Sequence, residues 1–227
     1  MAEQLAFSLP AKAALGRSDF LVAPPNADAV RGIEGWQAWP GRKLVLTGPA
    51  GSGKTHLAHV WAAESGATIL ATDALAGVLG RPLAPEARIA IEDADRIDDP
   101  ETELRLLGLH NLLQESGGWL LLTARRAPAQ WRLSLPDLAS RLQAAGLARL
   151  NEPDDTLLSG LLLKFFDDRQ LAVDPAVVAY LASRIERSFA AAQAIVARID
   201  QKALAQKRAI TRPFVAEILG ETGNPGD

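Results

Sequence analysis

The stretch from Gly48 to Thr55, GPAGSGKT, constrains the fold of this chain more than any other feature. It matches the pattern GxxxxGK[ST], and it lies directly between the apolar run KLVLT and the helical pattern THLAHVWAAE. Glycines in such a loop let successive backbone N–H groups and the following helix N-terminus face a phosphate. Because the strand, loop and helix occur in the required order, the stretch predicts an α/β domain that binds a nucleotide.

The residues of this loop are the first candidates for nucleotide contact. The expected set is Pro49, Ala50, Gly51, Ser52, Gly53, Lys54, Thr55 and His56. Lys54 would contact the β- and γ-phosphates, and the Thr55 hydroxyl would ligate Mg²⁺. The alternative is a glycine-rich turn that matches the pattern by chance, and the flanking strand and helix argue against it.

A nucleotide site of this kind also needs a carboxylate at the end of a neighbouring strand. Glu92 and Asp93, which follow the apolar run RIAI, are the candidates: Glu92 for the magnesium shell and Asp93 for the catalytic acid. Asp is usual at the first position, and the longer Glu92 displaces its carboxylate by about 1 Å, a misplacement that can cost ~100-fold in rate. We therefore expect Mg-nucleotide binding with slow hydrolysis. The alternative is that EDADRIDD is only a solvated acidic loop.

Further apolar runs with helical patterns between them predict a parallel sheet. The expected strands cover residues 43–47, 67–71, 88–91, 119–123 and 148–150. After residue 152 the pattern is helical only, with a helix beginning near Asp154, another at Pro175, a third from Phe189 to Ala203 and a fourth from Pro213 to Leu219. We expect an α/β domain over 11–152 with a five-stranded parallel sheet, and a small all-α domain over 153–227.

Composition excludes several other classes of function. The net charge is −3, from 24 basic and 27 acidic residues, so no overall positive field draws the chain onto nucleic acid. The chain has no cysteine, which excludes disulfides and thiolate-bound zinc. Neither a signal peptide nor a run of apolar residues long enough for a membrane span is visible, so we expect a cytoplasmic protein without membrane contact.

Three further stretches resemble the AAA+ family, and within it the DnaA family of bacterial replication initiators. DFLVAPPN, residues 19–26, resembles the entry to the adenine pocket, which implies a contact from Val22. LPDLASRL, residues 135–142, is similar to the segment that carries the arginine finger, and places that finger at Arg141. IERSF, residues 185–189, resembles the sensor II segment and implies that Arg187 contacts the nucleotide. A guanidinium suits these roles because its rigid fork of donors fits a phosphate.

The chain also departs from the initiators. Arg125 stands where the family usually has the acidic sensor I residue, and only about sixteen residues separate the second strand from the third, too few for the helical insertion that engages single-stranded DNA. The sequence ends soon after the expected helical domain, without a segment for the DNA-reading helix-turn-helix. We therefore expect no sequence-specific DNA binding.

An initiator-like core without a DNA reader resembles the Hda-type regulators. The resemblance implies ADP or ATP with Mg²⁺ as ligands, and the replication initiator as a partner whose ATP hydrolysis is stimulated by Arg141 in trans. It also implies attachment to the DNA polymerase sliding clamp through an N-terminal motif, QLxLx[L/P]. Residues 4–10, QLAFSLP, are similar to that motif, with Phe7 in place of the more usual Leu.

The residues themselves support a peptide of this kind. A short extended segment can bind a preformed groove, with Gln4 supplying hydrogen bonds and Leu5, Phe7 and Leu9 filling pockets. Pro10 prevents the segment from continuing as a core strand. The alternative is a tail that packs on its own domain. We expect residues 1–10 to form the clamp-binding peptide.

Two other functions stay open at this point. One is an autonomous AAA+ ATPase such as a helicase loader or a transposition ATPase, which would hydrolyse ATP with its own carboxylates and would usually contact DNA. The other is an interaction module that nucleotide merely stabilises. The sequence also leaves open whether ADP or ATP is the working ligand and whether the chain forms a homodimer.

Overall fold

The centre of the molecule is a parallel β-sheet. The computed structural model describes residues 16–78 and 82–220. The strands are β1 (Lys43–Thr47), β2 (Thr68–Leu70), β3 (Arg88–Ile91), β4 (Trp119–Ala124) and β5 (Gly146–Arg149). They are arranged in the order β2-β3-β4-β1-β5, and every neighbouring pair is parallel. The predicted α/β fold with five parallel strands is confirmed.

The strand ends differ slightly from the expected ranges. β2 is shorter than predicted, because only its three central residues pair with β3. β5 begins earlier, at Gly146, because its register runs beside β1 from Leu44 to Thr47. Leu150 lies just beyond the strand, although its backbone N–H still donates to the Thr47 carbonyl at 2.7 Å. Strand ends therefore depend on the neighbouring strand as well as on the local apolar run.

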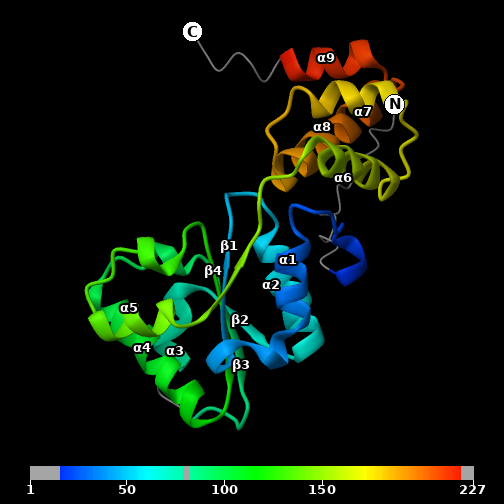
Figure 1. The fold of residues 1–227 in the computed structure, drawn as a ribbon. Coiled ribbons are helices and arrows are strands. Elements are labelled where there is room, and N and C mark those ends of the chain that lie inside the picture. Colours follow the sequence, from blue (N-terminus) through cyan, green and yellow to red (C-terminus); the bar gives the residue numbers. More distant parts are fainter. Residues whose placement is uncertain (1–15, 79–81, 221–227) are drawn as a thin grey trace, which may run out of the picture.

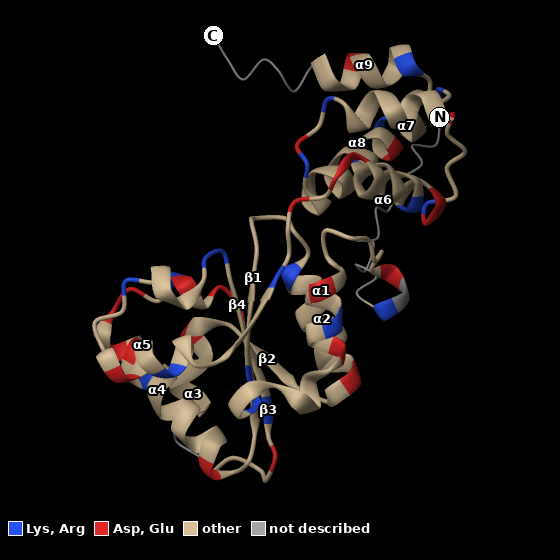
Figure 2. Cartoon of the chain, viewed as in Figure 1, with Lys and Arg blue, Asp and Glu red and all other residues tan. Residues whose placement is uncertain are grey.

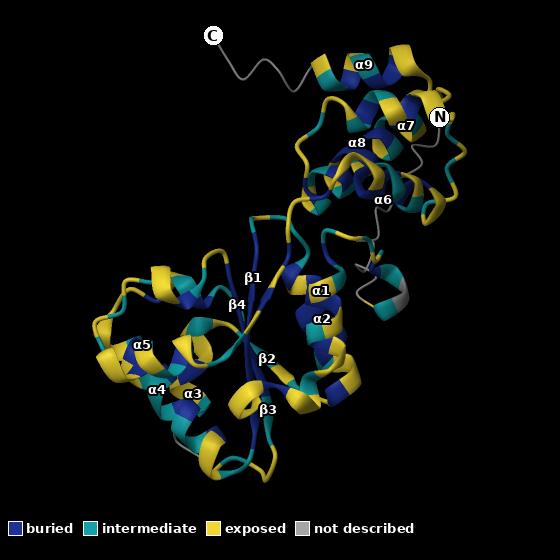
Figure 3. Cartoon of the chain, in the orientation of Figure 1, coloured by how far each residue is buried: buried dark blue, intermediate teal, exposed yellow. Residues whose placement is uncertain are grey.

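Helices cover both faces of the sheet (Figure 1). One face carries α1 (Ala27–Glu34) and α2 (Lys54–Ser65), and the other carries α3 (Leu75–Val78), α4 (Pro100–Glu115) and α5 (Pro136–Gln143). The central strand β1 is buried throughout, with Leu44 and Leu46 packed in one core cluster and Val45 in the other. Figure 3 shows β1, β3 and β4 as the buried layer between the two sets of helices, while the edge strands β2 and β5 are partly exposed. Burial on both faces explains why these strands are continuously apolar.

Short 3-10 turns connect several of these elements. They are η1 (Arg17–Asp19), η2 (Trp36–Ala38), η3 (Pro40–Arg42), η4 (Thr72–Ala74), η5 (Ala94–Arg96) and η6 (Pro128–Gln130).

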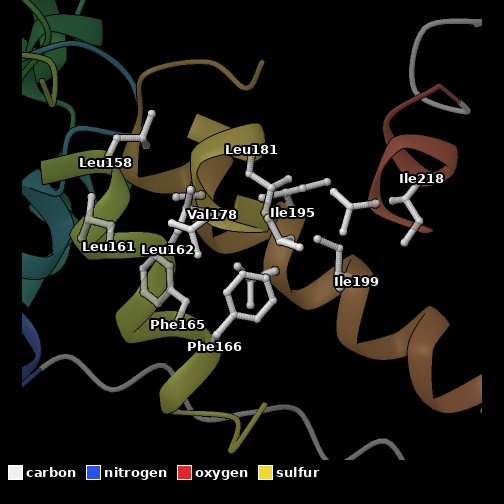
Figure 4. Packing of buried hydrophobic residues seen from close by; sticks show 14 of the residues in the cluster. Leu158, Leu161, Leu162, Phe165, Phe166, Val178, Leu181, Ile195, Ile199 and Ile218 are labelled. Carbon is white, nitrogen blue, oxygen red and sulfur yellow. The ribbon is translucent and has the colours of Figure 1, made fainter. Parts of the chain in front are cut away.

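A bundle of helices follows β5. It consists of α6 (Asp155–Asp167), α7 (Pro175–Ala182), α8 (Phe189–Gln206) and α9 (Arg212–Gly220). The first three begin at side-chain caps, since Asp154, Asp174 and Ser188 accept hydrogen bonds from backbone N–H groups of the first turn. Figure 4 shows the apolar core between these helices, with Phe166 and Leu162 of α6 facing α7 and α8. This bundle is called the lid below.

The lid lies beyond the end of the sheet at which β1 has its carboxyl end (Figure 1). In Figure 1 it lies beyond the carboxyl end of β1, where the phosphate loop is also found. Among the described helices, none combines the length and the apolar character that a bilayer crossing demands. The fold therefore brings two parts of the chain, the end of the sheet and the lid, to the same place.

Candidate nucleotide-binding site

The phosphate loop joins the carboxyl end of β1 to the amino end of α2. Gly53 caps α2 with a left-handed φ of 97°, and Gly51 has a φ of 69°. Glycine adopts such values without the penalty that a Cβ brings. The loop sequence therefore folds into the curled backbone that the pattern predicted.

Close approach also requires glycine in this loop. A Cβ on Gly53 would lie 3.0 Å from the Phe20 ring, and a Cβ on Gly51 would lie 2.9 Å from Ala190 Cβ. Phe20 comes from the segment before α1, and Ala190 comes from the lid helix α8. The glycines thus let the N-terminal segment and the lid pack directly on the phosphate loop.

The Lys54 side chain is hydrogen-bonded to the backbone of the phosphate loop. Its ammonium donates to the carbonyls of Gly48 and Pro49 at 2.8 and 2.7 Å. The side chain is buried, and burial lowers the pKa of Lys54, while the Asp93 carboxylate opposes that shift. Ser52 Oγ is buried nearby without a hydrogen-bond partner among the described atoms. A buried cation and an unpaired hydroxyl in a glycine-rich curl fit a phosphate group.

A pocket of about 620 Å³ opens above this loop, between the sheet and the lid. From the sheet domain it is lined by Asp19, Ala50, Gly51, Ser52, Gly53, Lys54, Thr55, His56, Asp93 and Arg125. From the lid it is lined by Lys164, Phe165, Asp168, Arg169, Phe189, Ala190 and Gln193. Its volume lies within the range of small-molecule and cofactor sites, roughly 300 to 1,000 Å³. The structure thus gathers most of the predicted loop residues around one cavity.

Aromatic rings connect the lid to the phosphate-loop helix. His56 packs edge-on against Phe20 and against Phe189 of α8, with ring centroids 5.2 and 5.8 Å apart. Phe189 in turn packs edge-on against Phe165 of α6, at 5.0 Å. Burial lowers the pKa of His56, so the ring is held as the neutral form. His56, in the first turn of α2, therefore packs in the wall of the pocket.

The two acidic residues after β3 take different positions. Asp93 lines the pocket, in a left-handed conformation with φ 50°, and its backbone N–H donates to Thr123 Oγ1 at 3.1 Å. Glu92 is not among the lining residues, and its Oε1 atom is buried without a hydrogen-bond partner among the described atoms. Of the two acidic residues after β3, Asp93 therefore lines the pocket and Glu92 does not.

These residues fit a magnesium nucleotide better than a metal bound by protein alone. The described residues contain no group of three or more His, Asp or Glu side chains that could hold a metal ion. Mg²⁺ usually takes one or two protein ligands together with phosphate oxygens and water. Thr55, which lines the pocket, and the Asp93 and Glu92 carboxylates are the groups that could hold it with a bound nucleotide.

Besides Glu92, four predicted site residues among the described ones lie outside this pocket lining. Val22 is 48% exposed, and Pro49 lines a neighbouring cleft. Arg187 precedes α8, and its guanidinium lies 2.8 Å from Asp155 of α6, with 56% of the side chain exposed. Arg141 is on α5, on the other face of the sheet from α1 and α2 (Figure 1). Of the predicted site residues, those from Ala50 to His56 and Asp93 line the pocket, and the nucleotide contacts of Val22, Pro49 and Arg187 stay predictions.

Arg141 is held by two polar partners. Its Nε donates to Asp137 Oδ1 and its Nη1 to Asn111 Oδ1, both at 2.9 Å. Buried Glu103 of α4 accepts hydrogen bonds from the backbone N–H groups of Ser134 and Leu135 at 2.9 Å and so fixes the start of α5. The guanidinium is thus fixed on the surface of the sheet domain, away from the pocket of its own chain.

The lid residues that line the pocket were not predicted from the sequence. Lys164 lies 3.4 Å from Asp19 and 2.9 Å from Asp168, so an ion-pair network joins the segment before α1 to α6 along the pocket wall. Lys164 and Asp168 are four residues apart beside the apolar face of α6, which is a local signal for a salt bridge. That signal does not tell which cavity the pair faces. The residues predicted to bind the clamp, Gln4, Leu5, Phe7 and Leu9, lie outside the described residues.

The lid is similar in sequence to a known family of lid domains. Residues 161–219 match the family model described as "Hda, lid domain". This range covers most of α6 and all of α7 and α8, and it ends within α9. The lid therefore has the sequence pattern of the Hda family.

The whole fold is similar to solved AAA+ structures. Domain III of the replication initiation protein DnaA from Thermotoga maritima superposes with a TM-score of 0.82 at 17% identity, over 96% of this chain and 100% of that one. AMPPCP-bound DnaA from Aquifex aeolicus gives 0.66 at 18% identity, over 82% of this chain and 64% of that one. The Holliday junction branch migration motor RuvB from Thermotoga maritima gives 0.62 at 19% identity, over 78% and 60%. At such identities the likeness concerns the fold. Together these findings show a fold like that of DnaA domain III, with a lid whose residues 161–219 match the Hda lid domain.

Proposed function

We propose that this chain is a cytoplasmic, ADP- or ATP-binding regulator of replication initiation. It docks on the DNA polymerase sliding clamp through the peptide from Gln4 to Pro10 and stimulates the replication initiator to hydrolyse its ATP. The match of residues 161–219 to the Hda lid domain carries the proposal, because it ties the helical bundle of this chain to that family. The domain limits 1–10, 11–152 and 153–227 belong to the same proposal.

The phosphate loop and the lid would hold the nucleotide between them. Lys54 and the backbone of Gly51 to Gly53 would bind its phosphates, and the aromatic ladder of Phe20, His56 and Phe189 would connect the loaded loop to the lid. Bound Mg²⁺ would supply positive charge to the phosphates. Because both halves of the pocket contribute to binding, the nucleotide would fix the position of the lid relative to the sheet.

The position of Arg141 supports a role in trans. The side chain is one-third exposed, lies on α5 rather than in the pocket, and is oriented by Asp137 and Asn111. A guanidinium supplied by one protein to the ATP of another stabilises the charge of the phosphoryl-transfer transition state, and is worth about 10³ to 10⁵ in rate. Arg141 would act in this way on the nucleotide of the initiator.

We expect the chain itself to hydrolyse ATP only slowly. Glu92 stands where the magnesium-binding Asp is usual, it does not line the pocket, and its Oε1 atom is buried. An autonomous ATPase would instead show steady turnover that rises when DNA is added. A turnover measurement on the purified chain with and without DNA therefore separates the two functions.

The sharpest test is Arg141→Ala. We expect the variant to bind ADP and the clamp like the wild type, while its stimulation of single-turnover ATP hydrolysis by the initiator falls by roughly 10³. Arg105→Ala is a matched control, because Arg105 also forms an ion pair with an acidic residue four positions earlier on an exposed helix, Glu101 of α4. The role of Arg141 would be contradicted if Arg141→Ala stimulated the initiator's ATP hydrolysis as well as wild type does. It would also be contradicted if Arg105→Ala lost as much stimulation as Arg141→Ala.

A further inference from the structure

A second cleft lies beside the phosphate loop, on the same edge of the sheet. It has a volume of about 600 Å³ and is formed at the carboxyl ends of β1, β4 and β5. Its lining has Arg125 in common with that of the nucleotide pocket and includes Gly48 and Pro49 at the start of the phosphate loop, but none of the residues from Ala50 to His56. It is therefore a separate site on the surface of the sheet domain.

Arginine dominates the charge of this cleft. Arg125 and Arg126 follow β4 and Arg149 ends β5, while Glu152 is the acidic residue of the lining. Figure 2 shows basic positions in the loop after β4, at the end of the sheet that faces the lid. The strand order places β4 and β5 on either side of β1, so these guanidinium groups come together although they are distant in sequence.

Among the residues that the structure describes, Arg126 and Arg149 differ from many other arginines because they form no ion pair. Arg17 pairs with Glu34 and Arg208 pairs with Glu217. Within residues 16–78 and 82–220, by contrast, no carboxylate forms an ion pair with Arg126 or Arg149, and both side chains are exposed. The whole chain is acidic, with a net charge of −3, so this cluster is a local feature. Unpaired guanidinium groups in a cleft favour an anionic ligand.

The other lining residues indicate which kind of anion fits. Exposed Leu147, 58% accessible, lies between the basic cleft and an apolar groove of about 270 Å³. The groove shares Ala127 and Leu147 with the cleft and continues along Val45, Pro128 and Leu142. Neither lining contains an aromatic ring on which a nucleic-acid base could stack. A ligand that fills both the cleft and the groove therefore needs carboxylates next to apolar side chains.

We propose that the cleft between β4 and β5 binds an acidic peptide segment of a partner protein, with carboxylates on Arg126 and Arg149 and an apolar side chain against Leu147. The two cavities together are large enough for a few residues in extended conformation. This site is independent of nucleotide binding and of the clamp-binding peptide, and it would give the sheet domain a contact of its own with the partner.

The test uses fluorescence anisotropy with the full chain at about 50 mM salt, where charged contacts are weakly screened. The probes are a labelled peptide of alternating glutamate and leucine, its lysine and leucine counterpart, and a labelled oligothymidylate of similar length. We expect saturable binding of the glutamate peptide only. Arg149→Glu and Arg126→Glu should each weaken that binding by about 10-fold or more, as expected for loss of a charged hydrogen bond, and Leu147→Ser should weaken it several-fold.

Arg132→Glu is the matched control, because Arg132 is exposed, carries the same charge and lines neither cavity. Its peptide affinity should stay within about twofold of wild type, since exposed charges at a distance are screened. Binding of fluorescent ADP should not change in any variant, which separates this site from the nucleotide pocket. Equal weakening by Arg132→Glu, tighter binding of the oligothymidylate, or no saturable binding of the glutamate peptide would each overturn the proposal.

Discussion

His110 shows how a single buried residue can set the pH dependence of this fold. It lies on α4, it is 5% exposed, and its Nδ1 has no hydrogen-bond partner among the described atoms. Burial, together with the charges of Lys43 and Arg141, lowers the pKa of His110 to about 4. The folded protein therefore holds this ring neutral at pH values where an exposed histidine, with a pKa of about 6.5, takes up a proton.

The consequence is a loss of stability on mild acidification. Between pH 6.5 and 4 the unfolded chain binds a proton at this histidine and the folded chain does not, so the free energy of unfolding falls as pH decreases, by at most about 1.4 kcal/mol per pH unit. Above pH 6.5 the contribution of His110 is fully present. His110→Gln should reduce the slope of unfolding free energy against pH, as measured by urea denaturation. Parallel slopes for variant and wild type would show that His110 is not the cause.

At the scale of elements, the contact between α8 and the phosphate loop connects the lid to the nucleotide site. The backbone N–H of Ala190 donates to the Gly51 carbonyl at 3.3 Å, and Ser188 caps α8 beside the same glycine. Because Ala190 and Ser188 cannot move independently of α8, any side chain on Gly51 must displace the lid helix or the loop.

Gly51→Ala should therefore weaken nucleotide binding. The added Cβ would meet Ala190 Cβ at 2.9 Å, and an overpacked contact costs about 1 to 3 kcal/mol, which corresponds to roughly 10- to 100-fold in ADP affinity. Gly66→Ala is the control: Gly66, which ends α2, has a similar φ of 76° and no atom within 4 Å of an added Cβ. Both variants should lose some stability, but fluorescent ADP should bind normally to Gly66→Ala. Equal affinities would argue against the lid contact.

At the scale of the whole molecule, the proposed clamp attachment and the proposed nucleotide binding belong to different parts of the chain. The peptide from Gln4 to Pro10 precedes the phosphate loop by many residues and follows a short motif of its own. The double variant Gln4→Ala with Leu5→Ala should lose capture by immobilised sliding clamp, because it removes the polar head and one apolar anchor. Fluorescent ADP should bind to it as to wild type. Lys12→Ala, outside the motif, is the control, and clamp binding retained by the double variant would refute the tether.

The extent of sequence-based prediction differed between local and distant features. The loop from Ala50 to His56 was predicted as a unit because its backbone geometry depends on glycines within one short stretch. Arg187 was predicted at the nucleotide by resemblance; in the structure it pairs with Asp155 of α6, and its contact with nucleotide stays a prediction. The lid residues Lys164 and Gln193 were not predicted, because their place in the pocket depends on how the bundle sits over the sheet.

The sequence by itself determined the elements whose causes lie within a few residues: the phosphate loop after β1, the continuously apolar strands, and the caps Asp154, Asp174 and Ser188 that begin the lid helices. Only the tertiary structure decided which distant residues meet. The order β4-β1-β5 brings Arg126 and Arg149 to one cleft, and the packing of α8 on Gly51 makes the lid a wall of the nucleotide pocket. Local patterns fix backbone conformation, whereas contacts across the chain depend on packing that no short stretch encodes.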